Sequence, residues 1–495
     1  MTKMRIHRHF TPAAARAWRG GAQKLVSSKM ACIVFLLCAG ATPSAQTFAT
    51  LVNFDGADGA NPYSVGLVQG FDGNLYGTTQ RGGANGLGTV FKITPSGTLT
   101  TLYSFCSQAN CADGAYPIAG LVPATDGDLY GTTYGGSGTT GFGTVFKVTP
   151  TGTLTTLYNF CAQQDCNDGS HPAAPLIQGA DGDFYGTTEL GGIKNGGTVF
   201  KITPAGTLTT LHSFCAQTGC ADGRKPVGGL VLGTDGNFYG TTEYGGNANV
   251  GTIFEITRGG TLTTLHSFGS FNFDGFLPQG GLVQAQNGNF YGTTGQGGLA
   301  SAGTVFTMTP SGVLTILHSF CTQLNCSDGS GPVAGLLLAT DGNLYGTTYQ
   351  GGFNSNDGTA FQITSSGTLT TLHTFDGTDG ANPFGALVQA TNGNFYATTY
   401  RQGASGDGSV FSLSMGLAPF VETLPTTGRV GTTVTILGND LTGTTSVTFN
   451  GTPSTFKVVG GSEIKTTVPA GATSGTVEVT TPTGTLQSNV SFVVR

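Results

Sequence analysis

The sequence has few charged residues, one tryptophan and no apolar run of the length that crosses a membrane. Its 495 residues include only 20 basic and 26 acidic side chains, which is too little charge for a conventional disordered chain. The 83 glycines do not recur at every third position, and this excludes a collagen-like triple helix. With 38% hydrophobic residues the chain can bury a core, and its length corresponds to several domains.

The first 45 residues have the pattern of a secretory leader. Seven basic residues precede position 30, and an apolar run at 30–41 and small residues up to Ala45 follow them. We expect cleavage after Ala41 or Ala45, because twelve apolar residues are too few to span a bilayer of about 30 Å as a helix. The mature chain is therefore predicted to be secreted or held at the cell surface, with no transmembrane segment.

Loss of this leader changes the charge of the chain. It leaves 13 basic residues against all 26 acidic ones, a net charge of −13. Such an acidic chain is a poor partner for nucleic acid. The single tryptophan, Trp18, is lost as well, so any platform for sugar rings has to use tyrosine.

Eight cysteines remain in the mature chain, as four pairs with the spacing C-x4-C. Paired cysteines at one spacing in an exported protein predict disulfides. Zinc needs two further ligands for each pair, and these loops supply none, so we predict neither a metal site nor a cofactor. The predicted bridges each close one loop: Cys106 to Cys111, Cys161 to Cys166, Cys215 to Cys220 and Cys321 to Cys326.

Three short motifs recur seven times in a constant order. Tyr-Gly-Thr-Thr begins at Tyr76 and recurs at steps of 51 to 55 residues, with Ala in place of Gly in the last copy. Gly-Thr-Val-Phe or a variant follows it, and a motif of the form T-L-x-x-F completes the unit. Turn signals divide the first unit into four strands, at 66–69, 74–79, 89–94 and 98–105, and Asp72-Gly73 predicts a two-residue type I′ hairpin turn. Four antiparallel strands in about 50 residues predict a propeller blade.

The two ends of the repeat region predict a closed ring. A T-L-x-x-F motif stands alone at 50–54, before any complete unit, and the seventh unit ends at Phe411 without one. We expect this N-terminal strand to complete the last blade by pairing near Val410 and Phe411, so that seven blades close without a free edge. An open solenoid is the alternative.

The repeated blocks Y-G-T-T-x-x-G-G and G-T-V-F-K-I-T-P-x-G-T-L-T-T-L resemble the GloVer-type (Gloeo/Verruco) tandem repeats of exported bacterial proteins. The resemblance covers about residues 47–416. It implies a bacterial surface or secreted protein, and the family carries no assigned activity.

A different pattern begins near residue 418. Short alternating strands with Gly and Pro turns fill fewer than 80 residues, which predicts a small β-sandwich, and the run 431–451 resembles an IPT/TIG immunoglobulin-like domain. Basic and acidic residues balance here, so no basic face exists for phosphates. The predicted chain is all-β, with a leader at 1–45, a seven-bladed β-propeller at 46–416 and the IPT/TIG domain at 417–495.

The long loops of the repeats are the candidate binding surface. Because connections in a meander alternate between its two ends, the Gly-rich loops and the blade-joining segments share one end, which we call the long-loop face. Each joining segment contains D-G-x-x-P, whose aspartate we interpret as a turn residue rather than a cation ligand. Side chains vary before this proline and after Tyr-Gly-Thr-Thr, through binding or through neutral drift. From these positions we select as binding residues Tyr116, His171, Lys225, Tyr134, Tyr244, Tyr349 and Arg401.

Catalytic motifs are scarce. The sequence has no G-x-S-x-G, H-E-x-x-H or P-loop, and four of the five mature histidines repeat one outer-strand position. Glu189 and Glu243 hold equivalent positions on adjacent blades and are the candidates for paired carboxylates. We favour a non-enzymatic binding or adhesion protein for a glycan or a cell-envelope protein. The alternatives are a carbohydrate-active hydrolase or lyase and a purely structural surface component.

Overall fold

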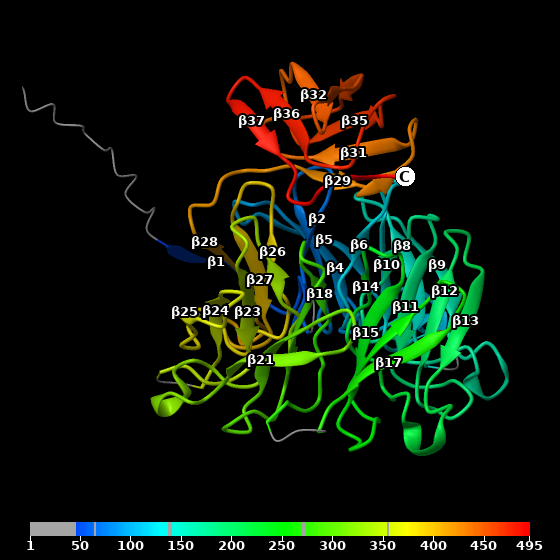
Figure 1. The fold of residues 1–495 in the computed structure, drawn as a ribbon. Helices are drawn as coiled ribbons and strands as arrows, with labels where there is room; N and C mark the ends of the chain where they lie inside the picture. The colour runs from blue at the N-terminus through cyan, green and yellow to red at the C-terminus, as the bar shows by residue number, and fades with distance from the viewer. Residues whose placement is uncertain (1–45, 64–65, 137–140, 270–272, 354–355) are drawn as a thin grey trace, which may run out of the picture. The chain divides into compact units, whose positions relative to one another are not determined.

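The structure is a computed structural model that describes residues 46–63, 66–136, 141–269, 273–353 and 356–495 (Figure 1). The predicted leader at 1–45 lies outside the described residues and stays a prediction. Within the described ranges the elements are strands and four short 3-10 helices, and none of the helices there has the length and hydropathy needed to cross a membrane. The 3-10 helices are η1 (Ala109–Cys111), η2 (Gln164–Cys166), η3 (Thr218–Cys220) and η4 (Leu324–Cys326).

Seven four-stranded antiparallel sheets follow one another along the chain, and each is one blade. The innermost strands of blades 1 to 7 are β2 (Val68–Gln69), β6 (Val122–Pro123), β10 (Ile177–Gln178), β14 (Val231–Leu232), β18 (Val283–Gln284), β22 (Leu337–Leu338) and β26 (Val388–Gln389). The second strands carry the Tyr-Gly-Thr-Thr motif: β3 (Leu75–Thr79), β7 (Leu129–Thr133), β11 (Phe184–Thr188), β15 (Phe238–Thr242), β19 (Phe290–Thr294), β23 (Leu344–Thr348) and β27 (Phe395–Thr399).

The two outer positions of each blade are equally regular. The third strands are β4 (Thr89–Ile93), β8 (Thr144–Val148), β12 (Thr198–Ile202), β16 (Thr252–Ile256), β20 (Thr304–Met308), β24 (Thr359–Ile363) and β28 (Ser409–Ser414). The outermost strands of blades 1 to 6 are β5 (Leu99–Ser104), β9 (Leu154–Asn159), β13 (Leu208–Ser213), β17 (Leu262–Ser267), β21 (Leu314–Ser319) and β25 (Leu369–Thr374). The predicted strands of the first unit are confirmed to within two residues at each end.

The N-terminal strand closes the ring, as predicted. β1 (Thr47–Asn53) pairs antiparallel with β28 and forms the sheet β1-β28-β27-β26 of blade 7. Thr50 lies opposite Phe411, and Val52 lies opposite Val410. The open solenoid is therefore wrong, because the outer strand of the last blade comes from the other end of the repeat region.

The hairpin turns differ from the prediction. Between β2 and β3 the chain makes a three-residue loop, in which the Gly73 amide donates to Gly70 and the Gly70 amide donates to Asn74. Gly73 has a φ of +79°, whereas a type I′ turn needs positive φ at both central residues and Asp72 does not have it. Asp72 instead accepts hydrogen bonds from the Asn74 amide and from the Tyr76 hydroxyl. The carboxylate thus stabilises the longer loop, and the type I′ assignment is wrong.

The core lies between neighbouring blades. Tyr76, Val90 and Phe105 of blade 1 pack in one cluster with Leu121 and Phe146 of blade 2, and the other blade pairs repeat this arrangement. The motif glycine has a packing role: a Cβ on Gly186 would lie 2.7 Å from Leu176 Cδ2 and 2.8 Å from Phe200 Cζ. Close packing of these large side chains leaves no space for a methyl group there.

The C-terminal module is a small β-sandwich, as predicted. Its two four-stranded sheets have the orders β29-β31-β35-β34 and β33-β32-β36-β37, and a parallel pair β30-β38 joins its ends. Val434, Ile436, Phe449 and Phe492 form part of its core. Its strands are β29 (Glu422–Leu424), β30 (Thr427–Gly428), β31 (Thr433–Leu437), β32 (Ser446–Phe449), β33 (Thr452–Pro453), β34 (Phe456–Val458), β35 (Glu463–Thr467), β36 (Val477–Thr481), β37 (Gly484–Gln487) and β38 (Val493–Val494).

Candidate functional site

The seven blade-joining segments converge on one small cavity, which we call the mouth pocket. Its volume is about 170 Å³. Each blade contributes the residue that follows the proline of D-G-x-x-P, just before the innermost strand, and two glutamates complete the lining. The lining residues are Tyr63, Ile118, Ala173, Val227, Gln279, Val333 and Phe384, with Glu189 and Glu243.

The mouth pocket continues into a second cavity that follows the innermost strands. This channel has a volume of about 330 Å³ and shares Val227, Gln279, Val333 and Phe384 with the mouth pocket. Its further lining is apolar and small, mainly leucine, valine and glycine. Polar recognition is therefore concentrated in the mouth pocket.

Two glutamates form what we call the acidic wall of the pocket. Glu189 follows β11 in blade 3, and its Oε1 atom accepts a hydrogen bond of 2.9 Å from Lys225 Nζ, an ion pair whose glutamate side chain is only 15% exposed. Glu243 follows β15 in blade 4, and its Oε1 atom accepts a 2.8 Å hydrogen bond from Gln279 Nε2. The two carboxylates consequently have different partners, one a cation and the other a neutral amide.

The electrostatics of this wall follow from burial. Desolvation raises the pKa of Glu243, and the negative charge of Glu189 acts in the same direction, while Gln279 and Lys225 oppose the shift. Burial, together with the charge of Glu189 and a hydrogen bond to it, raises the pKa of Tyr134 to about 12. Tyr134 is therefore a neutral hydroxyl donor to Glu189 at physiological pH.

Aromatic side chains form the other side of the pocket, which we call the aromatic wall. The rings of Tyr63 and Phe384 stack with centroids 4.5 Å apart and an interplanar angle of 25°. Tyr400 contacts Tyr63 edge to face at 5.4 Å, and Tyr349 contacts Phe384 in the same way at 4.9 Å. Burial raises the pKa of Tyr63, and the nearby Tyr400 and the two glutamates add to the shift. These contacts hold a preformed aromatic surface.

The blade order sets these two walls across the ring from each other. Tyr63 precedes β2 of blade 1 and Phe384 precedes β26 of blade 7, which are neighbours through the closing strand. In a ring of seven, blade 4 with Glu243 lies directly opposite the junction of blades 7 and 1. The mouth pocket therefore has an aromatic wall and an acidic wall with a cavity between them.

Four of the predicted binding residues support this pocket from its periphery. Lys225 pairs with Glu189, and Tyr134 hydrogen-bonds to the same carboxylate. The His171 ring lies 4.8 Å from that of Tyr134, and burial lowers the pKa of His171, while Glu189 opposes the shift. Tyr349 supports Phe384. These residues act on the pocket through the residues that line it.

The remaining predicted binding residues lie outside the pocket lining. The Arg401 guanidinium stacks on Tyr400 at 5.1 Å, and Tyr244 lies beneath Arg224 at 5.4 Å and Lys225 at 6.0 Å. Tyr116 is 36% exposed and is not part of the lining. Their proposed role in binding stays a prediction.

The position before the proline is more constrained than its sequence variation indicated. In all seven segments it has positive φ, between 53° and 65°. Glycine and asparagine adopt this left-handed conformation most readily, and Asn61, Gly331 and Asn382 follow that preference. The residue after the proline varies between blades from alanine to tyrosine. This variation is the sequence feature that could have indicated the pocket.

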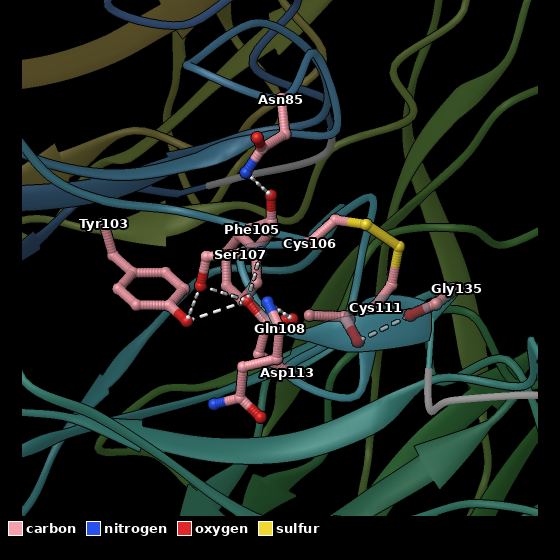
Figure 2. The surroundings of a disulfide bond; sticks show 10 residues. Asn85, Tyr103, Phe105, Cys106, Ser107, Gln108, Cys111, Asp113 and Gly135 are labelled. Atoms are coloured by element: carbon pink, nitrogen blue, oxygen red, sulfur yellow. Dashed lines mark hydrogen bonds between the residues drawn. A yellow bond between two sulfur atoms is a disulfide. The ribbon is translucent and has the colours of Figure 1, made fainter.

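The outer rim carries the four predicted disulfides, and each is confirmed within its own loop. Figure 2 shows the first. Asp113, buried completely, accepts hydrogen bonds from the Ser107 amide at 2.9 Å, the Gln108 amide at 3.2 Å and the Tyr103 hydroxyl at 2.7 Å. The D-G-x-x-P aspartate thus fixes the loop behind the disulfide, which supports its structural interpretation.

The outer-strand histidines take the place of these tyrosines. His212 Nε2 lies 3.1 Å from Asp222 Oδ2, and His318 Nε2 lies 3.1 Å from Asp328 Oδ2. The tyrosine or histidine at this outer-strand position thus pairs with the aspartate of the D-G-x-x-P segment that follows it. The sequence pattern alone did not indicate this pairing. In the described part of the chain, no three His, Cys, Asp or Glu side chains gather as they would around a metal ion.

Several solved structures are distantly similar to this chain. Two are extracellular domains from B. thetaiotaomicron proteins assigned as hybrid two-component and one-component systems: identity is 12% and 11%, TM-scores are 0.47 and 0.49, and the matches cover 85% and 91% of this chain. The chain spans 50% and 58% of their lengths. A third is a gluconolactonase from Xanthomonas campestris, at 13% identity and TM-score 0.39, with 75% of this chain and 90% of that chain covered. No curated protein matches the sequence.

Family models match nearly all of the described chain. The Gloeobacter/Verrucomicrobia repeat matches three times, at residues 38–167, 162–325 and 321–456, and the IPT/TIG domain matches at 420–494. The last repeat match extends into the first strands of the IPT/TIG region, whereas the blades end with β28. The chain belongs to the Gloeobacter/Verrucomicrobia repeat family and carries an IPT/TIG domain at its C-terminal end.

Proposed function

We propose that this protein is a secreted or cell-surface binding protein that holds one terminal unit of a glycan in the mouth pocket. Four disulfides support an extracellular location, because such bonds persist in oxidising compartments. The observation that carries the proposed activity is the aromatic wall facing carboxylate and amide groups across one cavity.

Sugar rings present two kinds of surface, and the pocket offers a partner for each. The C–H face of a pyranose packs on an aromatic ring such as Tyr63 or Phe384, and its hydroxyls donate to carboxylates such as Glu189 and Glu243. Small-molecule sites combine apolar or aromatic side chains with a few placed polar groups, and the mouth pocket has both kinds of lining. At about 170 Å³ the pocket is smaller than the roughly 300–1,000 Å³ of sites that enclose drug-sized ligands, so it fits a single unit and not a chain.

A glycan array followed by titration calorimetry tests this proposal. Phe384→Ala removes half of the stacked pair and is expected to weaken binding at least tenfold, because an aromatic contact beyond simple burial contributes about 0.5–1.5 kcal/mol in addition to the lost area. Phe353→Ala is the matched control, because that phenylalanine is 62% exposed and lies outside the lining. The proposal fails if no glycan binds, or if both variants weaken binding equally.

The acidic wall also supports a second candidate, a glycan hydrolase or lyase. A pair of carboxylates in different environments is the usual pattern of an acid and base pair. Here Glu189 forms an ion pair with Lys225, and burial favours the neutral form of Glu243. Incubation with the bound glycan and assay of new reducing or unsaturated ends decides between the two. Turnover lost in Glu243→Gln with binding retained would favour the enzyme.

A further inference from the structure

The charges of the acidic wall are not balanced within the pocket. Lys225 Nζ lies 2.9 Å from Glu189 and forms its ion pair. Glu243 accepts its hydrogen bond from the neutral amide of Gln279, and among the described residues it has no ion-pair partner of its own. A carboxylate that is taken out of water without a cation costs free energy, because its attraction to solvent dipoles is lost. A ligand that brings a positive charge offsets this cost.

The aromatic wall also favours a positively charged ligand. The ring faces of tyrosine and phenylalanine attract cations through their quadrupoles, and the attraction is stronger when the cation is desolvated. Tyr63 and Phe384 line the cavity opposite blade 4, and the two glutamates are close enough to raise the pKa of Tyr63. A cation in the pocket therefore meets aromatic rings on one side and the unpaired carboxylate on the other.

We propose that the unit held in the mouth pocket carries a free, positively charged amine, and that Glu243 is its counter-ion. The ligand class is then an amino sugar whose nitrogen is not acetylated. This inference rests on the proposed glycan-binding function and adds the charge of the ligand to it. A neutral sugar leaves Glu243 unpaired, and a uronic acid adds a third negative charge beside Glu189.

Three trisaccharides of one linkage separate charge from shape: β-1,4-linked glucosamine, its fully N-acetylated form and β-1,4-linked glucose. Titration calorimetry at pH 7 with the purified protein is expected to give the glucosamine trimer at least tenfold higher affinity than the other two. Glu243→Gln keeps the shape and the Gln279 contact site but removes the charge, and it is expected to abolish that preference.

Glu255→Gln is the matched control, because Glu255 lies on β16 of the same blade and bonds to Asn237 away from the pocket. It is expected to keep the preference. Unchanged melting temperatures of both variants show that neither has lost its fold. Loss of the preference in Glu255→Gln as well as in Glu243→Gln would overturn the assignment to Glu243.

The outcomes separate this inference from the proposed function. Equal binding of all three trisaccharides, unaffected by Glu243→Gln, supports glycan binding and overturns the amine. Binding of tetramethylammonium that depends on Glu243, with no trisaccharide bound, supports the cation site and overturns the glycan. If none of the four compounds binds, both proposals are wrong.

Discussion

Closure of the ring by β1 predicts a large effect of removing this strand. A deletion of residues 46–54 removes all of the pairing between β1 and β28 and the side chain of Phe54, which is 0% exposed. β28 then becomes an edge strand with unpaired amide and carbonyl groups, and such edges recruit other chains. We expect the deleted protein to melt at a lower temperature and to aggregate.

The size of the expected drop in melting temperature can be worked out for a single substitution, Phe54→Ala. The Phe54 ring meets Phe91 at a centroid distance of 5.2 Å and an angle of 66°, and truncation of a buried phenylalanine to alanine costs about 3–5 kcal/mol. With an unfolding entropy of about 2.1 cal/mol/K per residue, 1 kcal/mol lowers the melting temperature of a ring of about 370 residues by roughly 1.3 °C. Phe54→Ala is therefore expected to lower it by about 4–6 °C.

The chain supplies a matched control for this variant. Phe105 holds the same place in blade 1, is 0% exposed and meets Phe146 at 5.2 Å and 66°, but its strand is continuous with its own blade. Differential scanning fluorimetry and light scattering compare Phe54→Ala, Phe105→Ala and the deletion. Equal shifts in melting temperature for the two substitutions would show that the closing blade unfolds together with the rest of the ring. A deleted protein that stays monomeric and melts unchanged would refute closure in solution.

The remaining predictions concern the loops, the core and pH. Replacing Cys106 and Cys111 with serine removes a bridge that spans five residues and should cost no more than about 2–3 kcal/mol by thermal melting, because so short a loop confines little chain entropy and Asp113 still holds it. Gly186→Ala should cost about 1–3 kcal/mol in a denaturant titration, because its Cβ would meet Leu176 and Phe200, whereas Ala397→Gly, the reverse change in blade 7, should cost less. Burial lowers the pKa of His171 in the folded protein, so below about pH 6.5 the histidine is protonated more in the unfolded chain than in the folded one. The free energy of unfolding should therefore fall as pH drops below about 6.5, and His171→Phe should reduce this pH dependence relative to the natural protein. As pH falls, binding of a glucosamine oligomer should weaken because Glu243 takes up a proton, and the loss should begin above pH 4.5, the ordinary pKa of glutamate, because burial raises the pKa of Glu243; calorimetry across pH 4–8 should show this loss in the natural protein and not in Glu243→Gln.

Most of the fold could be predicted from the sequence because all blades bury the same residue types at the same positions of the repeat. The buried tyrosine, threonine pair and phenylalanine of each unit recur wherever the same contact recurs, and the lone motif at 50–54 identified the closing strand. The type I′ turns were not predicted correctly, since Asp-Gly also suits a three-residue loop in which only glycine has positive φ. The pairing of the outer-strand histidines with aspartates was missed because the partners lie ten residues apart, across the disulfide loop.

The candidate site was only partly accessible. Glu189 and Glu243 were selected as a pair and do line one cavity, because equivalent positions in a ring point to the same axis. Tyr63, Phe384 and Gln279 were missed, since their convergence depends on the inward tilt of seven separate segments. The ion pair of Lys225 with Glu189 crosses from one blade to the next, and no local spacing in the sequence encodes it.

The pairing of β1 with β28 also sets the order in which the ring assembles. Asn53 lies opposite Ser409, so this contact joins the first strand of the ring to leave the ribosome with nearly the last. Each of the other six blades is a local meander that forms without distant partners, whereas the seventh closes a loop of most of the ring and cannot form before β28 has been synthesised. During synthesis the leading strand therefore has no partner until the last blade has emerged, and the finished propeller forms only then.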